Sequence, residues 1–151
     1  MLLLTFLFAT LLGSSESTPP PEEQAIIKAA VEFAHVTPIE QTLLLEAMPS
    51  PLVGLQDQPY ATTLGTGGTL PISHELVGAI REANNQRRSL KGVVLTTNAG
   101  HNRLVVSRPG ISRDGSSAIV VIEDMHRYNI QYLEKRDGAW RVVALGPRAE
   151  F

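Results

Sequence analysis

Asp124 and His126 are the side chains in this sequence best placed to act together in catalysis. Alternate residues of a strand point to one face, so the two share a face if the strand runs through Met125. A carboxylate beside an imidazole orients the ring and raises its pKa, which would make His126 a general base. The alternative is that Glu-Asp-Met-His-Arg is a solvated connection between two strands, and its density of charge favours this alternative.

Other catalytic patterns are absent from the sequence. No two histidines stand four residues apart and no His-Glu-x-x-His occurs, so we expect neither a metal site nor a cofactor. Without cysteine there is no thiolate chemistry, and neither Gly-x-Ser-x-Gly nor Ser-x-x-Lys is present. The stretch GTGGT at residues 65–69 lacks the Gly-Lys-Ser/Thr of a phosphate-binding loop, and we interpret it as a mobile loop.

The first residues are typical of a secretory signal peptide. Leu2 to Leu12 contain only Leu, Phe, Ala and two Thr, and small and polar residues follow to Ser17. Such a run spans roughly 17 Å as a helix, which is too short to cross a bilayer. We predict a signal peptide at residues 1–17, cleaved after Ser15 or Ser17, a proline-rich spacer at 18–21 and one domain at 22–151, with no transmembrane anchor after cleavage.

Composition narrows the choice of partner. The 13 basic and 15 acidic side chains give a net charge of −2, which argues against nucleic acid as the main partner. The absence of cysteine excludes a lipid anchor on a cysteine and excludes disulfides. Burial alone must stabilise the domain, and the expected partner is a small molecule or an envelope protein.

Two helices early in the domain precede a series of strands. Hydrophobic periodicity predicts helices at Glu22–His35, with Ile26, Ala29, Ala30 and Phe33 inward, and at His74–Asn85, with Leu76, Val77, Ile80 and Ala83 inward. Between them we expect a short strand within Thr42–Pro51 and a long loop over Leu52–Pro71. Alternation predicts strands at Gly92–Thr97, Asn102–Arg108, Ser116–Met125, Arg127–Arg136 and Ala139–Leu145.

The last three strands are joined by short turns. Asp137-Gly138 is a strong signal for a two-residue hairpin, because both positions tolerate positive φ. We expect Trp140, Val142 and Ala144 to share one face and to pack against the early helices. The fold class is therefore α+β, with two helices on an antiparallel sheet that ends in a three-stranded meander.

The tail carries a recognisable pattern of residues. Ser107, Arg108, Gly110, Asp114, Gly115, Ala118 and Val120 are followed by Leu133, Lys135, Gly138, Trp140 and Val142. This S-R-x-G-x-x-x-D-G-x-x-A-x-V…L-x-K-x-x-G-x-W-x-V pattern resembles a group of bacterial exported proteins of uncharacterised function. The resemblance implies export to the periplasm or the cell exterior and a shared fold.

The order of elements is also similar, at the level of fold, to the cone-like nuclear-transport-factor and ketosteroid-isomerase-like proteins. In that group a curved sheet and helices enclose a pocket used for catalysis or for binding. Because no catalytic constellation stands out and the tail pattern consists of turn and core residues, the expected function is non-enzymatic binding of a ligand or partner. The alternatives are a small-pocket isomerase, cyclase or dehydratase that uses Asp124 and His126, and a module that binds through a sheet edge.

Overall fold

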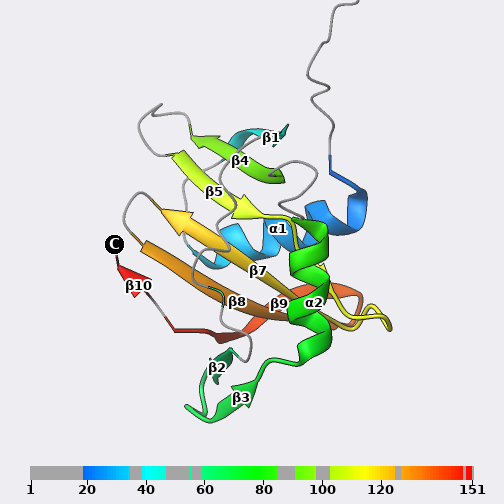
Figure 1. Cartoon of the computed structure of the whole chain (residues 1–151), viewed down its shortest axis with the longest axis vertical. Helices are drawn as coiled ribbons and strands as arrows, with labels where there is room; N and C mark the ends of the chain where they lie inside the picture. The colour runs from blue at the N-terminus through cyan, green and yellow to red at the C-terminus, as the bar shows by residue number, and fades with distance from the viewer. Residues whose placement is uncertain are drawn as a thin grey trace, which may run out of the picture.

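The computed structural model describes residues 19–34, 39–46, 55, 59–84, 91–97, 103–124, 127–147 and 149–150. Within these ranges two helices pack on one antiparallel sheet, which confirms the predicted α+β class (Figure 1). The helices are α1 (Pro21–Phe33) and α2 (His74–Ala83). The strands are β1 (Ile39–Glu46), β2 (Tyr60–Thr63), β3 (Thr69–Pro71), β4 (Lys91–Thr97), β5 (Arg103–Ser107), β6 (Gly110–Ile111), β7 (Ser117–Asp124), β8 (Arg127–Arg136), β9 (Ala139–Leu145) and β10 (Ala149–Glu150).

Strands that are distant in sequence meet in this sheet. The main order is β1-β4-β5-β7-β8-β9-β2-β3, while β6 pairs with β7 and β10 pairs with β8. Strands β7, β8 and β9 are consecutive in the chain and in the sheet, and each pair is antiparallel. Residues 1–18, which include the predicted signal peptide, lie outside the described residues.

The two helices cover opposite faces of the sheet. Along β7, the side chains of Ala118, Val120 and Ile122 pack with α1, whereas those of Ile119 and Val121 pack with α2. All five are buried, because alternate residues of a strand point to opposite faces and each face here is covered. In Figure 1, α2 lies in front of the sheet and α1 behind it.

Helix α1 begins at a proline, as expected of a helix start. Its buried stripe is Ile26, Ile27, Ala30 and Val31, which differs from the predicted stripe because Phe33 is 37% exposed. Trp140 of β9 packs against this stripe and is 7% exposed, and its Nε1 donates a hydrogen bond to Glu22 Oε1 at 2.9 Å. The prediction that the indole is buried against the first helix is confirmed.

Helix α2 follows the predicted pattern closely. Ser73 is the N-cap, and its Oγ accepts a hydrogen bond from the backbone N–H of Leu76. Leu76, Val77 and Ile80 are buried. The backbone of Gly110 in β6 approaches so closely that a Cβ there would stand 2.4 Å from the backbone nitrogen of Ile80. Glycine at position 110 therefore lets β6 lie directly on α2.

The turn between β8 and β9 is the predicted two-residue hairpin. Asp137 and Gly138 have φ of 51° and 79°, so both residues take the left-handed conformation that the Asp-Gly pair favours. The prediction for the faces of β9 is wrong in one place. Tyr132 pairs with Ala144 and Leu133 with Val142, so Val143 is an extra residue in β9. This bulge turns Ala144 to the α2 side, away from Trp140 and Val142.

The predicted loop over Leu52–Pro71 is also wrong in part, because it contains the hairpin of β2 and β3. Gly65 and Gly67 take positive φ in the turn between the two strands. The glycines that led to the prediction of a loop therefore close a hairpin. Strand β2 joins β9, and the carbonyl of the bulged Val143 accepts a hydrogen bond from the Leu64 N–H. The stretch GTGGT, residues 65–69, thus belongs to this hairpin.

Candidate functional site

The proposed catalytic pair lies at the limit of what the structure describes. The backbone of Asp124 ends β7 and pairs with Arg127 at the start of β8. The side chain of Asp124 and the whole of His126 lie outside the described residues. The enzymatic hypothesis on this pair therefore stays a prediction.

Other polar residues considered from the sequence are partly described. His74 opens α2 and is exposed, while His35, His101, Arg87 and Arg88 lie outside the described residues. Arg81 donates a hydrogen bond to the carbonyl of Leu55 at 3.2 Å. Among the residues that the structure describes, no three acidic or histidine side chains are grouped so as to hold a metal ion.

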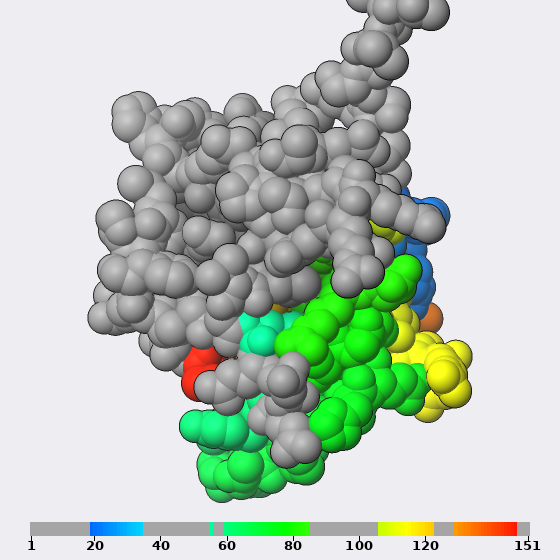
Figure 2. All heavy atoms as spheres, viewed as in Figure 1, coloured from blue at the N-terminus to red at the C-terminus, as the bar shows by residue number. Residues whose placement is uncertain are grey.

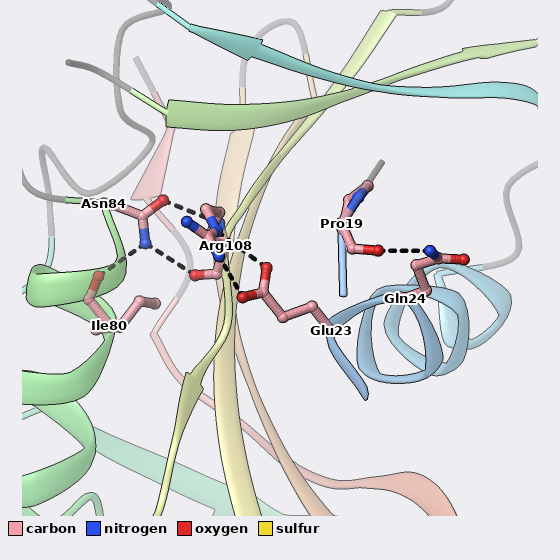
Figure 3. Close-up of polar contacts among 6 residues, drawn as sticks. All are labelled: Pro19, Glu23, Gln24, Ile80, Asn84 and Arg108. Carbon is pink, nitrogen blue, oxygen red and sulfur yellow. Dashed lines mark hydrogen bonds and ion pairs between the residues drawn. The ribbon is translucent and has the colours of Figure 1, made fainter. Parts of the chain in front are cut away.

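One buried polar cluster links the two helices across the sheet, and we call it the interhelical joint: Glu23, Arg108 and Asn84 (Figure 3). Arg108 follows β5, and its guanidinium donates to both carboxylate oxygens of Glu23 on α1, with Nε 2.9 Å from Oε2. These side chains are 20% and 12% exposed. The Glu23 carboxylate raises the pKa of Arg108 through this hydrogen bond, so the guanidinium keeps its positive charge.

Asn84 completes the joint from the end of α2. Its Nδ2 donates to the carbonyls of Ile80 at 2.7 Å and Arg108 at 2.8 Å, and its Oδ1 accepts from the Arg108 N–H at 2.9 Å. Asn84 is fully buried, and these bonds use both amide hydrogens and the carbonyl oxygen. The joint is thus a structural contact in which Asn84 has no donor left for a ligand and its oxygen already has a partner.

Other residues of the tail pattern also have structural partners. The buried Ser107 Oγ accepts a hydrogen bond from the Val121 N–H at 2.9 Å. Lys135 makes an ion pair with Glu22 at 2.9 Å and lies over the ring of Trp140, 5.7 Å from its centroid. The hydrogen bond from Lys135 is the main cause of the lowered pKa of Glu22. These residues of the tail pattern therefore stabilise the fold through contacts within the chain.

A polar groove lies where the start of α2 meets the turn between β6 and β7. In Figure 2 this turn (yellow) lies beside α2 (green). The groove consists of two open hollows, of about 410 Å³ and about 470 Å³, whose linings share Glu75 and Arg113. Glu75 Oε1 accepts a hydrogen bond from the Arg113 N–H at 2.7 Å and holds the turn to the helix. We call the two hollows together the α2 groove, and its polar lining is Ser73, His74, Glu75, Glu82, Ser112, Arg113, Asp114, Ser117 and Tyr132.

Asp114 organises the turn that forms one wall of the α2 groove. Its carboxylate accepts hydrogen bonds from the Ser112 hydroxyl at 2.6 Å and from the N–H and hydroxyl of Ser116. These bonds lower the pKa of Asp114 to about 2, the bond from Ser112 contributing most. A group with this pKa is ionised near neutral pH, so Asp114 is unsuited to act as a general acid there.

Two further amides differ from Asn84 in their surroundings. Asn129 and Gln131 lie two residues apart on β8, and we call them the amide pair. Asn129 Oδ1 and Gln131 Oε1 are both buried and accept no hydrogen bond. Sequence reasoning missed them, because polar residues that alternate with Ile130 and Tyr132 are typical of a solvated strand face.

No helix in the described part of the chain is long and apolar enough to cross a membrane. The chain matches no model of a protein family, no curated protein and no solved structure. The resemblance to bacterial exported proteins therefore stays a prediction.

Proposed function

We propose that this chain is an exported, non-enzymatic binding domain and that the α2 groove holds a small polar ligand. The α2 groove is the observation that carries the proposal. It combines volume with a mixed lining of hydroxyls, carboxylates and one guanidinium. Such convergent polar groups fix the orientation of a ligand in a binding site.

The state of the carboxylates favours binding over acid–base catalysis. The Asp114 carboxylate accepts hydrogen bonds from within its own turn, and one oxygen of Glu75 accepts a hydrogen bond from the Arg113 N–H. A general acid or base needs a pKa near the working pH, whereas the pKa of Asp114 is about 2. Asp114 therefore shapes the α2 groove, and the second carboxylate oxygen of Glu75 is the acceptor that the groove offers a ligand.

The Arg113 side chain is the main donor in the α2 groove. Arg113 belongs to the lining of both hollows, and no carboxylate among the described residues makes an ion pair with its guanidinium. A guanidinium presents several hydrogen-bond donors in a fixed plane. A ligand that spans the α2 groove would contact Arg113.

A binding screen tests this proposal with the mature domain, residues 18–151. Monosaccharides, free amino acids and nucleosides serve as probes, and a rise in melting temperature identifies a ligand. We expect Arg113→Gln to weaken binding about tenfold, the effect of losing one charge-assisted hydrogen bond. Arg141→Gln removes an exposed arginine of β9 outside the α2 groove and serves as the control. Equal loss in both variants, or no ligand among the probes, would contradict the α2 groove as the site.

Export is tested separately with the full chain. The run Leu2 to Leu12 and the small residues after it support export to the periplasm or the cell exterior. In bacterial cells we expect the exported fraction to contain a chain that begins at Glu16 or Thr18, as measured by intact mass. A full-length chain that stays inside the cell would contradict export and would leave the binding result unaffected.

A further inference from the structure

The amide pair faces the side of the sheet that α1 covers. Gln131 is opposite Val120 on the neighbouring strand, and Asn129 is opposite Ile122. Directly opposed residues of antiparallel strands point to the same face, and Val120 and Ile122 pack in the α1 core. The amide pair therefore belongs to the face opposite the α2 groove.

Both carbonyl oxygens of the amide pair are in an energetically unfavourable position. Gln131 is 1% exposed, and neither its Oε1 nor Asn129 Oδ1 accepts a hydrogen bond. An unsatisfied buried acceptor destabilises the fold, because the group has lost water without gaining a donor. Two such atoms side by side call for a specific explanation.

The rest of the described structure shows that the fold does satisfy buried polar side chains. The other two buried polar residues are Asn84, which uses its whole amide, and Ser107, which accepts from the Val121 N–H. The amide pair is the exception among the described residues. A general inability of this fold to satisfy polar groups does not explain it.

The surroundings of the amide pair limit what could bind there. Its neighbours by strand register are Val120, Ile122 and Leu145, and Leu133 follows on the same face. All four are uncharged and apolar, so a charged ligand would lose its hydration without a counter-charge from these neighbours. Residues two apart on a strand are separated by about 7 Å, which sets the spacing of the acceptors.

We propose that Asn129 and Gln131 form a second binding site, which takes a small uncharged molecule with two hydrogen-bond donors on an apolar frame. The donors supply the two hydrogen bonds that the carbonyl oxygens lack, and the frame packs on the neighbouring aliphatic side chains. This site is independent of the α2 groove, since the two lie on opposite faces of the sheet.

Three dihydroxybenzenes (catechol, resorcinol and hydroquinone) test the proposal, because they present two donors at three separations on one ring. Their dimethyl ethers keep the ring and lack the donors. Titrations followed by ¹⁵N-edited NMR report directly on the side-chain amides of Asn129 and Gln131. We expect at least one diol to shift these two signals and its ether not to do so.

Variants separate binding from folding. Gln131→Met keeps the length of the side chain without its acceptor, and we expect about fivefold weaker binding of the diol. Leu133→Met, on the same face of β8, should bind normally. In the absence of diol, Gln131→Met should be as stable as the wild type or more stable, since it removes an unsatisfied polar group.

Several results would overturn the second site. They are no binding by any of the three diols, equal binding of the ethers, and unchanged binding in Gln131→Met. A marked loss of stability in Gln131→Met would overturn it as well, because it would show that the amide is needed for the fold itself.

Discussion

Asn84 and Gln131 carry the same amide group and are both buried, yet the fold treats them in opposite ways. Asn84 donates twice and accepts once, and so ties the end of α2 to the backbone of Arg108. Gln131 leaves its carbonyl oxygen without a donor, as does its neighbour Asn129. Burial alone therefore does not reveal what a polar residue does.

The contrast separates two uses of a buried amide. A saturated amide stabilises one arrangement of the chain, since its loss leaves several hydrogen-bonding partners unsatisfied at once. An unsaturated amide costs stability and is retained where it serves another purpose, as is common at functional sites. The interhelical joint is of the first kind, and we assign the amide pair to the second.

The largest effect is expected at Asn84. Asn84→Leu leaves the N–H and C=O of Arg108 without their partner, and we expect the free energy of unfolding to fall by about 3 kcal/mol. Urea denaturation measures this change. A loss below about 1 kcal/mol, the net value of a single hydrogen bond, would show that the joint is not the structural contact described here.

The next effect concerns the charged half of the joint. Glu23→Gln removes the charge that faces Arg108, and we expect a loss of roughly 2 kcal/mol, less than for a fully buried pair because both side chains are partly exposed. Glu32→Gln is the matched control. Its pair with Lys28 has both side chains at least two-thirds exposed, and its removal should change stability by less than about 0.5 kcal/mol. Similar losses in the two variants would refute a special role for the joint.

A gain in stability is expected at the amide pair. The double variant Asn129→Leu/Gln131→Met removes both unsatisfied acceptors, and we expect an increase of about 1 kcal/mol in the free energy of unfolding. Ser107→Ala is the comparison, because its hydroxyl is buried and accepts from Val121, and it should lower stability by about 1 kcal/mol. If the double variant loses stability as Ser107→Ala does, the distinction between the two kinds of amide fails.

The smallest effect is a change in the slope of stability with pH. The folded pKa of Asp114 is about 2, below its ordinary value of 3.8, so its contribution is present above pH 4 and is lost as the pH falls toward 2. Asp114→Asn should therefore show a shallower fall of melting temperature between pH 4 and pH 2 than the wild type. Parallel curves would show that the Ser112 and Ser116 hydrogen bonds do not favour the ionised carboxylate.

Local chemistry made much of the fold predictable. The Asp137-Gly138 turn, the Ser73 cap and the stripe of α2 depend on neighbouring residues, and all three are confirmed. The bulge at Val143 and the β2–β3 hairpin were not predicted. The two features meet where β2 pairs with β9, and these strands are far apart in the sequence and leave no periodic signal of their pairing.

The candidate sites were less predictable than the fold. Arg113 and Glu75 come together through the docking of a turn on a helix, and the sequence separation between them hides that contact. Gln131 was hidden for a different reason. A polar residue in an alternating strand predicts a solvated face, and only the packing of α1 on the sheet shows that this face is covered.

Both helices pack on strand β7, which is synthesised after them. Strand β7 begins at Ser117, whereas α1 ends at Phe33 and α2 at Ala83, so neither helix has its packing surface until most of the chain has left the ribosome. Contacts between segments so distant form slowly, because the intervening chain must first lose entropy. Delayed folding of this kind is compatible with the export proposed above, because a chain that stays extended for longer can be translocated before it becomes compact.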